Sequence, residues 1–285
     1  MGQLDNKAAL ITGGAHGFGR VLALTLAREG ADIAIADIGR SRQASQFAVE
    51  YDAAPINLVV HEIEALGRKA IGLLADVRQR EDCQRMAEKT IEAFGKIDIL
   101  CANAGTFLDD MRPAWELSED DWDVVLDVNL KGAWLTTKYV VPHMIQRQYG
   151  KVIVTASRNA LKAEANFAHY VAAKHGLIGF TKALAIELGP YEINVNAICP
   201  TQMVDKSRPP RSTTRPYWDL VVGHPNATYA EFDAASGREN LFERRGQLDF
   251  AEAAEAVLWL ASDRARAITG QAVPVDNGWM VKRRG

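Results

Sequence analysis

The chain has 285 residues, of which 48% are hydrophobic and 24% are charged, which is typical of a folded globular protein and excludes a disordered or collagen-like chain. Its 33 Lys and Arg residues against 36 Asp and Glu give a formal net charge of −3. This balance excludes an overall positive field of the kind that holds nucleic acid or an anionic membrane surface.

The three cysteines, Cys83, Cys101 and Cys199, are too widely spaced for a zinc site or a disulfide framework, which favours a reducing compartment and no metal. No apolar run approaches the ~20 residues of a membrane helix. The first residues also lack the pattern of a secretion signal. The sequence therefore predicts a cytoplasmic protein that binds neither membrane nor nucleic acid.

Short apolar runs alternate with longer helical segments from end to end. Because these runs show little alternation of apolar and polar residues, both faces of each strand should be buried, as in a parallel sheet between two helical layers. The predicted fold is a single α/β domain over residues 1–285, a doubly wound Rossmann sheet of about seven parallel strands. The predicted strands are residues 8–12, 32–37, 70–74, 97–101, 152–155, 194–198 and 272–275.

Boundary residues predict three of the helices. Residues 17–29 end at Gly30, residues 119–130 follow Ser118, and residues 168–188 precede Gly189. Two longer segments interrupt the alternation, an insert at residues 38–54 and a segment at residues 202–247. The second follows a strand end and holds several aromatic residues, so we expect a substrate lid; the alternative is a surface excursion with its own small core.

A glycine-rich turn links the first strand to the first helix. Gly13, Gly17 and Gly19 allow a pyrophosphate to approach the backbone N–H groups of a helix N-terminus, although the spacing differs from G-x-G-x-x-G. Asp37 ends the second strand, where a carboxylate can accept both hydroxyls of an adenosine ribose and repel a 2′-phosphate. This favours NAD over NADP, although Arg40 and Arg42 leave NADP open.

Tyr170 and Lys174 lie four residues apart, on one face of a largely apolar helix. An ammonium beside a phenol stabilises the phenolate, so we expect Lys174 to lower the pKa of Tyr170 toward the range of a general acid or base. Ser157 follows a strand and could face the phenol across the carboxyl edge of the sheet. Asn129 is a polar amide within a helical segment.

In this order along the chain, these motifs resemble the short-chain dehydrogenase/reductase family. The resemblance implies that Tyr170 exchanges a proton with the substrate, that Ser157 binds the same oxygen, and that Lys174 holds the nicotinamide ribose, with Asn129 anchoring a water relay. It also implies direct hydride transfer with NAD. The further cofactor-binding positions that it implies are Phe18, Asp76, Val77, Asn103, Ala104, Gly105, Pro200 and Thr201, besides the glycines, Asp37, Tyr170 and Lys174.

A narrower likeness is to the mycofactocin-associated, carveol dehydrogenase-like branch. It rests on the insert between Asp37 and Asp76, on the run His169 to Gly176 and on Cys199-Pro200-Thr201. This branch implies a tightly held NAD and an external electron acceptor. Asp205 stands where the family commonly has a threonine that holds the nicotinamide carboxamide, which leaves that contact to Thr201, Lys206 or Ser207.

Aromatic and aliphatic residues in the variable segments favour a mostly apolar secondary alcohol or cyclic ketone, for example one resembling a terpene. Arg112, Arg158 and Lys162 keep an acidic substrate open. The alternatives are an NADP-dependent carbonyl reductase and a dinucleotide-sensing regulator without turnover. The family resemblance further implies a homotetramer.

Overall fold

The computed structural model describes residues 2–39, 53–107, 112–207 and 215–282, except for the side chains of residues 215–217 and 220. Seven parallel strands form one sheet in the order β3-β2-β1-β4-β5-β6-β9, which confirms the predicted doubly wound fold. The strands are β1 (Ala8–Thr12), β2 (Asp32–Asp37), β3 (Ala70–Leu74), β4 (Ile99–Ala102), β5 (Gly150–Thr155), β6 (Ile193–Pro200) and β9 (Ala272–Val275).

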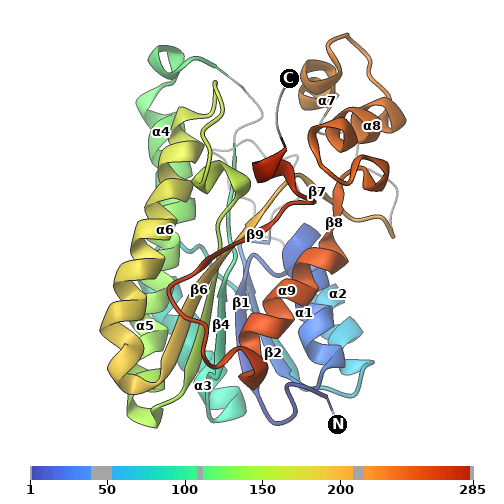
Figure 1. Cartoon of the computed structure of the whole chain (residues 1–285). Coiled ribbons are helices and arrows are strands. Elements are labelled where there is room, and N and C mark those ends of the chain that lie inside the picture. Colours follow the sequence, from blue (N-terminus) through green and yellow to red (C-terminus); the bar gives the residue numbers. More distant parts are fainter. Residues whose placement is uncertain (1, 40–52, 108–111, 208–214, 283–285) are drawn as a thin grey trace.

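Helices cover both faces of this sheet, and each strand sends alternate residues into each layer. From β1, Leu10 packs into the core on one face, whereas Ala9 and Ile11 pack into the core on the other. The first core is closed by α3 (Arg80–Phe94), α5 (Gly132–Arg147) and α6 (Ala168–Leu188), and the second by α1 (Gly17–Arg28), α2 (Ala54–Glu64) and α9 (Phe250–Ala261). The two layers stand on either side of the sheet in Figure 1.

The sheet has its topological switch point between β1 and β4, which are neighbours in the sheet but not in the chain. Strands β2 and β3 lie on one side of β1, and the chain then crosses to β4, β5, β6 and β9 on the other. Ligands of such sheets bind outside the carboxyl ends of the strands at this switch point. The order of the strands therefore places a candidate site where the segments after β1 and β4 meet.

The segment 202–247 leaves the sheet and returns to the same place. Strand β7 (Met203–Val204) pairs in parallel with β8 (Leu248–Asp249), and the backbone N of Leu248 donates to the carbonyl of Gln202 at 3.1 Å. Between them lie α7 (Arg215–Val222) and α8 (Tyr229–Glu239). Trp218, Ala227 and Phe232 form a small core of their own, in which the rings of Trp218 and Phe232 stack 5.5 Å apart.

The insert expected at residues 38–54 falls largely on residues 40–52, which lie outside the described residues; α2 begins directly after them. Helix α4 (Glu119–Leu126) is shorter than predicted, because the chain continues as a π-helical turn, Asp127–Lys131, before α5. Among the described residues, no helix combines the length and apolarity needed to cross a membrane.

The N-terminal segment lies at the end of the sheet opposite to α7, α8 and the C-terminal turn Trp279–Val281 (Figure 1). Near that lower end, Gln3 accepts a hydrogen bond from Arg264 at 3.3 Å. The carboxyl ends of the strands therefore face α7, α8 and the C-terminal turn.

Candidate active site

Hydrogen bonds join the turn after β1 to the loop after β4. The Oγ1 atom of Thr12 accepts from the backbone N atoms of Asn103 and Ala104, both at 3.0 Å. The side-chain amide of Asn103 donates in return to the carbonyl of Thr12 at 3.0 Å. These bonds hold the glycine turn and the segment from Asn103 to Gly105 together at the switch point.

The glycine turn has the shape that a bound pyrophosphate requires. Gly13 and Gly17 have positive φ angles of 66° and 48°, and a Cβ on Gly19 would lie 1.9 Å from the carbonyl oxygen of Gly13. Helix α1 has no acidic residue in its first turn, so the helix dipole favours an anion there. The side chain of Phe18 packs on Phe250, with ring centroids 6.0 Å apart, which leaves only its backbone for a ligand.

Asp37 lies beside this turn, as predicted for a residue that binds a ribose. Its Oδ2 atom accepts from the backbone N of Ala15, and its Oδ1 atom accepts from the backbone N of Gly39, both at 3.0 Å. A carboxylate has about four acceptor positions, and the described residues use two of them. The carboxylate is thus fixed in place by the backbone on both of its oxygens.

Asp76 and Val77 follow β3, the strand next to β2. The Asp76 carboxylate is buried and is held by the Nε and Nη2 atoms of Arg78, with Nη2 at 2.6 Å from Oδ2. Val77 packs so close to Gly132 at the start of α5 that a Cβ there would lie 2.6 Å from its Cγ2 atom. Both residues therefore lie directly after β3, beside the start of α5.

The π-helical turn directs Asn129 inward. Its Nδ2 atom donates to the carbonyls of Thr106 at 2.7 Å and Val125 at 2.8 Å. Its Oδ1 atom is buried and has no hydrogen-bond partner among the described residues. A Cβ on Gly105 would lie 2.9 Å from this oxygen and 3.6 Å from the Nζ atom of Lys174, so the three residues converge.

Ser157, Tyr170 and Lys174 meet at the end of β5. The Ser157 hydroxyl lies close enough to the phenol of Tyr170 to lower the phenol's pKa as a hydrogen-bond donor. The Nζ atom of Lys174 donates to the carbonyl of Thr155 at 2.8 Å and lies 5.5 Å from the centroid of the Tyr170 ring. Phe107 packs edge-on against the same ring, with centroids 6.2 Å apart. The predicted catalytic residues thus occupy one place, on the segment after β5 and on the facing side of α6.

Burial dominates the ionisation of this group. It raises the pKa of Tyr170. The hydrogen bond from Ser157 and the positive charge of Arg158 lower this pKa, and the negative charge of Glu164 raises it. Burial lowers the pKa of Lys174 to about 8. The expectation that Lys174 lowers the pKa of Tyr170 is therefore wrong for the protein without cofactor, because desolvation raises that pKa and the groups that lower it are Ser157 and Arg158.

Thr201 and Pro200 lie at the end of β6. The backbone N of Thr201 donates to the carbonyl of Val275 at 3.1 Å, and its hydroxyl accepts from the Nη1 atom of Arg158 at 3.1 Å. Asp205 is used locally, since its Oδ1 atom accepts from the backbone N of Ser207 at 3.0 Å. Thr201 is thus the polar side chain at this strand end.

The sequence did not indicate how Arg158 is used. Its buried guanidinium binds Glu164, Glu239 and Thr201 and stacks on Trp279. The available signal was an arginine directly after the strand-end Ser157, which was read only as a contact for an acidic substrate. Its partners lie up to 121 residues further along the chain, so no local pattern could reveal them.

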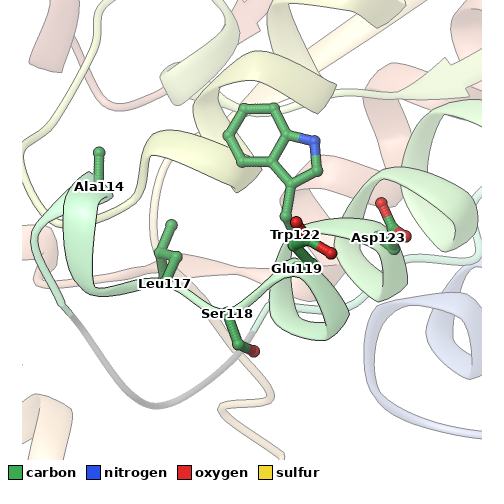
Figure 2. A pocket seen from close by; sticks show the side chains of 6 residues that line it. All are labelled: Ala114, Leu117, Ser118, Glu119, Trp122 and Asp123. Carbon is green, nitrogen blue, oxygen red and sulfur yellow. The ribbon is translucent and has the colours of Figure 1, made fainter.

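A hollow on the surface lies away from these residues, at the start of α4. Figure 2 shows Trp122 above it, and its lining residues are Ala114, Leu117, Ser118, Glu119, Trp122 and Asp123. None of the predicted site residues lines it. We therefore place the candidate site at the switch point.

The sequence profile of the family described as short chain dehydrogenase matches residues 7–213. The chain belongs to this family. It is 34% identical to (−)-trans-carveol dehydrogenase of Rhodococcus erythropolis over 287 residues, with 99% of this chain and 100% of that protein covered. It is 30% identical to a 3-oxoacyl-acyl-carrier-protein reductase of Thermotoga maritima, with 98% and 100% covered.

Among solved structures, carveol dehydrogenase from Mycobacterium avium in complex with NAD superposes with a TM-score of 0.88 at 33% identity. The match covers 99% of this chain and 100% of that one. These full-length similarities confirm the predicted likeness of this short-chain dehydrogenase to the carveol dehydrogenase-like branch.

Proposed function

We propose that the protein oxidises a mostly apolar secondary alcohol, or reduces the matching ketone, with Tyr170 as the general acid or base. The protein is an NAD-dependent short-chain oxidoreductase, because it belongs to that family and resembles a relative crystallised with NAD over its full length. The observation that carries the proposed mechanism is the convergence of Ser157, Tyr170 and Lys174 beside the glycine turn.

NAD fits the residues at the switch point. Its pyrophosphate would lie at the start of α1, and Asp37 would accept hydrogen bonds from the adenosine ribose. Asp76 and Val77 would border the adenine, and the segment from Asn103 to Gly105 would line the path of the cofactor. Lys174, Pro200 and Thr201 would border the nicotinamide end. When bound, NAD supplies the carbon that accepts or donates the hydride.

The chain's own residues would handle the proton. In alcohol oxidation, the Tyr170 phenolate accepts the hydroxyl proton while the Ser157 hydroxyl donates a hydrogen bond to the same substrate oxygen. Lys174, whose Nζ atom lies 5.5 Å from the centroid of the Tyr170 ring, would hold the nicotinamide ribose beside the phenol. The unpartnered Oδ1 atom of Asn129 would bind a water that connects Lys174 to solvent.

An apolar substrate suits the groups around Tyr170. Phe107 covers its ring, and the two described arginines considered for an acidic substrate are bound by carboxylates, Arg112 by Asp121 at 2.8 Å and Arg158 by Glu164 at 2.9 Å. These pairings argue against either arginine as a free cationic clamp, whereas the exposed Lys162, 5.1 Å from the centroid of the Trp279 ring, keeps an acidic substrate open. We propose that segment 202–247 acts as a lid over this substrate and that the insert at residues 38–54 covers the NAD, with an external acceptor reoxidising it.

We also propose that the enzyme is a homotetramer in the cytoplasm. The exposed apolar side chains of Trp134 on α5 and Ile186 on α6 support an interface on these two helices, and Ile186 is 79% exposed in the single chain. A dinucleotide sensor without turnover would not need Ser157, Tyr170, Lys174 and Asn129 in one place. Their convergence favours an enzyme.

Replacing Tyr170 tests the mechanism. Tyr170→Phe should lower kcat by roughly 100- to 10,000-fold, because it removes the group that transfers the proton. Affinity for NAD, measured by calorimetry, should stay near that of the wild type. The assay would use (−)-trans-carveol and a panel of cyclic secondary alcohols, both with added NAD and with an artificial electron acceptor.

Tyr191→Phe is the matched control, because Tyr191 lies at the surface beyond the end of α6 and should leave turnover unchanged. Undiminished turnover in Tyr170→Phe would refute the assigned role. Absence of turnover on every alcohol and acceptor, with NAD bound, would favour the sensor instead.

A further inference from the structure

Arg158 is a charged residue that the fold buries next to the catalytic serine, with 6% of its surface exposed. A buried guanidinium is stable only when its donors are paired. Its Nη2 atom lies 2.9 Å from Glu164, and its Nη1 atom lies 3.1 Å from the hydroxyl of Thr201 and 3.5 Å from Glu239. Its Cζ atom lies 4.3 Å from the centroid of the Trp279 ring.

These contacts bring together four segments that are distant in sequence. Glu239 is the last residue of α8 in segment 202–247, Trp279 begins the C-terminal turn, and Thr201 follows β6. The indole Nε1 atom of Trp279 donates to the same Oε2 atom of Glu239 at 3.1 Å. The guanidinium of Arg158 therefore connects α8, the C-terminal turn and the end of β6 to the loop that contains Ser157.

The same pair of charges acts on the catalytic phenol in opposite directions. The positive charge of Arg158 lowers the pKa of Tyr170, and the negative charge of Glu164 raises it. Lys174 faces the ring from the same helix, and Cys199 of β6 interacts with Lys174. On α4, Asp121 binds Arg112, and both act on His169, the neighbour of Tyr170.

We propose that Arg158 is a positioning residue, which balances the charge around the Tyr170 hydroxyl through Glu164 and fastens α8 and the C-terminal turn to the Ser157 loop. The inference rests on the proposed role of Tyr170. The hydrogen bonds of Arg158 with the described residues go to Thr201, Glu164 and Glu239 and not to the phenol, so Arg158 acts through the residues that it holds.

Removing each member of the pair separates a charge effect from a loss of structure. Arg158→Met leaves Glu164 without its cation, so the pKa of Tyr170 should rise. Glu164→Gln leaves Arg158 less neutralised, so that pKa should fall. Each shift should be roughly 1 pH unit. If the ion pair between Arg158 and Glu164 had only a structural role, both variants would break it and would not shift the pKa of Tyr170 in opposite directions.

The pKa is measured in two ways on the NAD-saturated protein. The first is the pH dependence of kcat/KM for the alcohol that is oxidised fastest, whose rise with pH reports the phenolate. The second needs no turnover: the ultraviolet absorbance of the phenolate is titrated, and the titration of a Tyr170→Phe protein in the same background is subtracted. Absence of turnover in the wild type as well as in the variants would therefore refute the proposed function, whereas the absorbance titration would still decide this inference.

Arg158→Lys keeps the charge but not the forked geometry, so its titration should stay close to that of the wild type. If Glu164→Gln titrates at the same pH as the wild type, or if Arg158→Met and Glu164→Gln shift in the same direction, the electrostatic part of the proposal is wrong. A poorly folded Arg158→Met protein leaves the other two variants to decide.

Hydrogen exchange tests the attachment of α8. Arg158→Met and Arg158→Lys should both speed amide exchange in α8 and the C-terminal turn, because both lose contacts with Glu239 and Trp279. The control is Glu243→Gln, which breaks an exposed ion pair between the turn after α8 and Lys282, the residue that follows the C-terminal turn. Equal protection of α8 in the Arg158 variants and the wild type would overturn this part.

Discussion

At the glycine turn, backbone atoms occupy the space that a side chain would need. A Cβ on Gly19 would lie 1.9 Å from the Gly13 carbonyl oxygen and 2.7 Å from the Nδ2 atom of Asn103. That amide also holds Thr12, so a displaced Asn103 would disturb both loops at the switch point. One methyl group at this position should therefore affect the cofactor site more than the rest of the fold.

Gly19→Ala should weaken NAD binding by about tenfold or more, which corresponds to about 1.4 kcal/mol. It should also lower the free energy of unfolding by about 1–3 kcal/mol, because the turn is overpacked. Calorimetry and denaturant unfolding measure the two effects. NAD affinity equal to that of the wild type would contradict this reading of the turn.

Gly189→Ala is the matched control. A Cβ at Gly189 would have nothing within 4 Å, and its φ of −53° suits alanine. The substitution should leave NAD binding unchanged and stabilise the protein by about 0.4–1 kcal/mol, since alanine restricts the unfolded chain.

Spacing in the sequence predicts that the candidate catalytic residues converge, because each lies on a regular element or directly after a strand. Tyr170 and Lys174 share a helical face, and Ser157 follows β5 at the carboxyl edge of the sheet. Their pKa values could not be predicted, since burial decides them and burial depends on segments far away in sequence. The role of Arg158 could not be predicted for the same reason, because Glu239 and Trp279 contact it only in the folded chain.

At the scale of elements, the helix that bears Asn129 differs from its prediction. A continuous helix over residues 119–130 was expected, but a π-helical turn interrupts it at Asp127–Lys131. Its cause lies in tertiary contacts: Asn129 binds the carbonyl of Thr106, and Gly132 packs on Val77. Neither contact changes the helical spacing of apolar residues in the sequence, so the π-helical turn could not be predicted.

The start of α4 is fixed by a capping box, which predicts a local stability effect. The Ser118 hydroxyl accepts from the backbone N of Asp121 at 3.1 Å, and the Asp121 carboxylate accepts from the backbone N of Ser118 at 3.3 Å. Ser118→Ala should therefore cost about 1 kcal/mol, a fall in Tm of roughly 2–4 °C. Ser118→Thr, which keeps the hydroxyl, is the control. Equal Tm values for Ala and Thr, measured by calorimetry, would show that the cap contributes nothing.

At the scale of the whole molecule, the sheet is the part that the sequence predicts best. Both faces of its strands are buried, so each strand forms an apolar run, and the seven predicted strands all appear with ends shifted by at most two residues, as at β4. The segment 202–247 is less predictable. Its aromatic residues are the ground for expecting a substrate lid, but Trp218 is buried in the segment's own small core, because Phe232 and Tyr229 pack on it.

Binding of NAD should stabilise the whole domain, because the cofactor site joins segments from both halves of the sheet. At a free concentration 100 times its Kd, NAD should add about 2.7 kcal/mol to the free energy of unfolding. NADP at the same concentration should add much less, since Asp37 repels a 2′-phosphate. Thermal unfolding with each nucleotide measures this, after removal of any NAD that co-purifies. Equal stabilisation by the two nucleotides would contradict the role of Asp37.

The two ends of the described chain differ in what an attachment to them would disturb. The first residues lie below the sheet, at the end remote from Tyr170, whereas Trp279 contacts Arg158 and the turn that contains it adjoins α8. Tethering the enzyme to an electrode or a solid support through its amino end should leave the carboxyl ends of the strands, where the candidate site lies, facing the solution. A fusion at the carboxyl end would instead place the fused protein beside the contacts that Arg158 makes with Glu239 and Trp279.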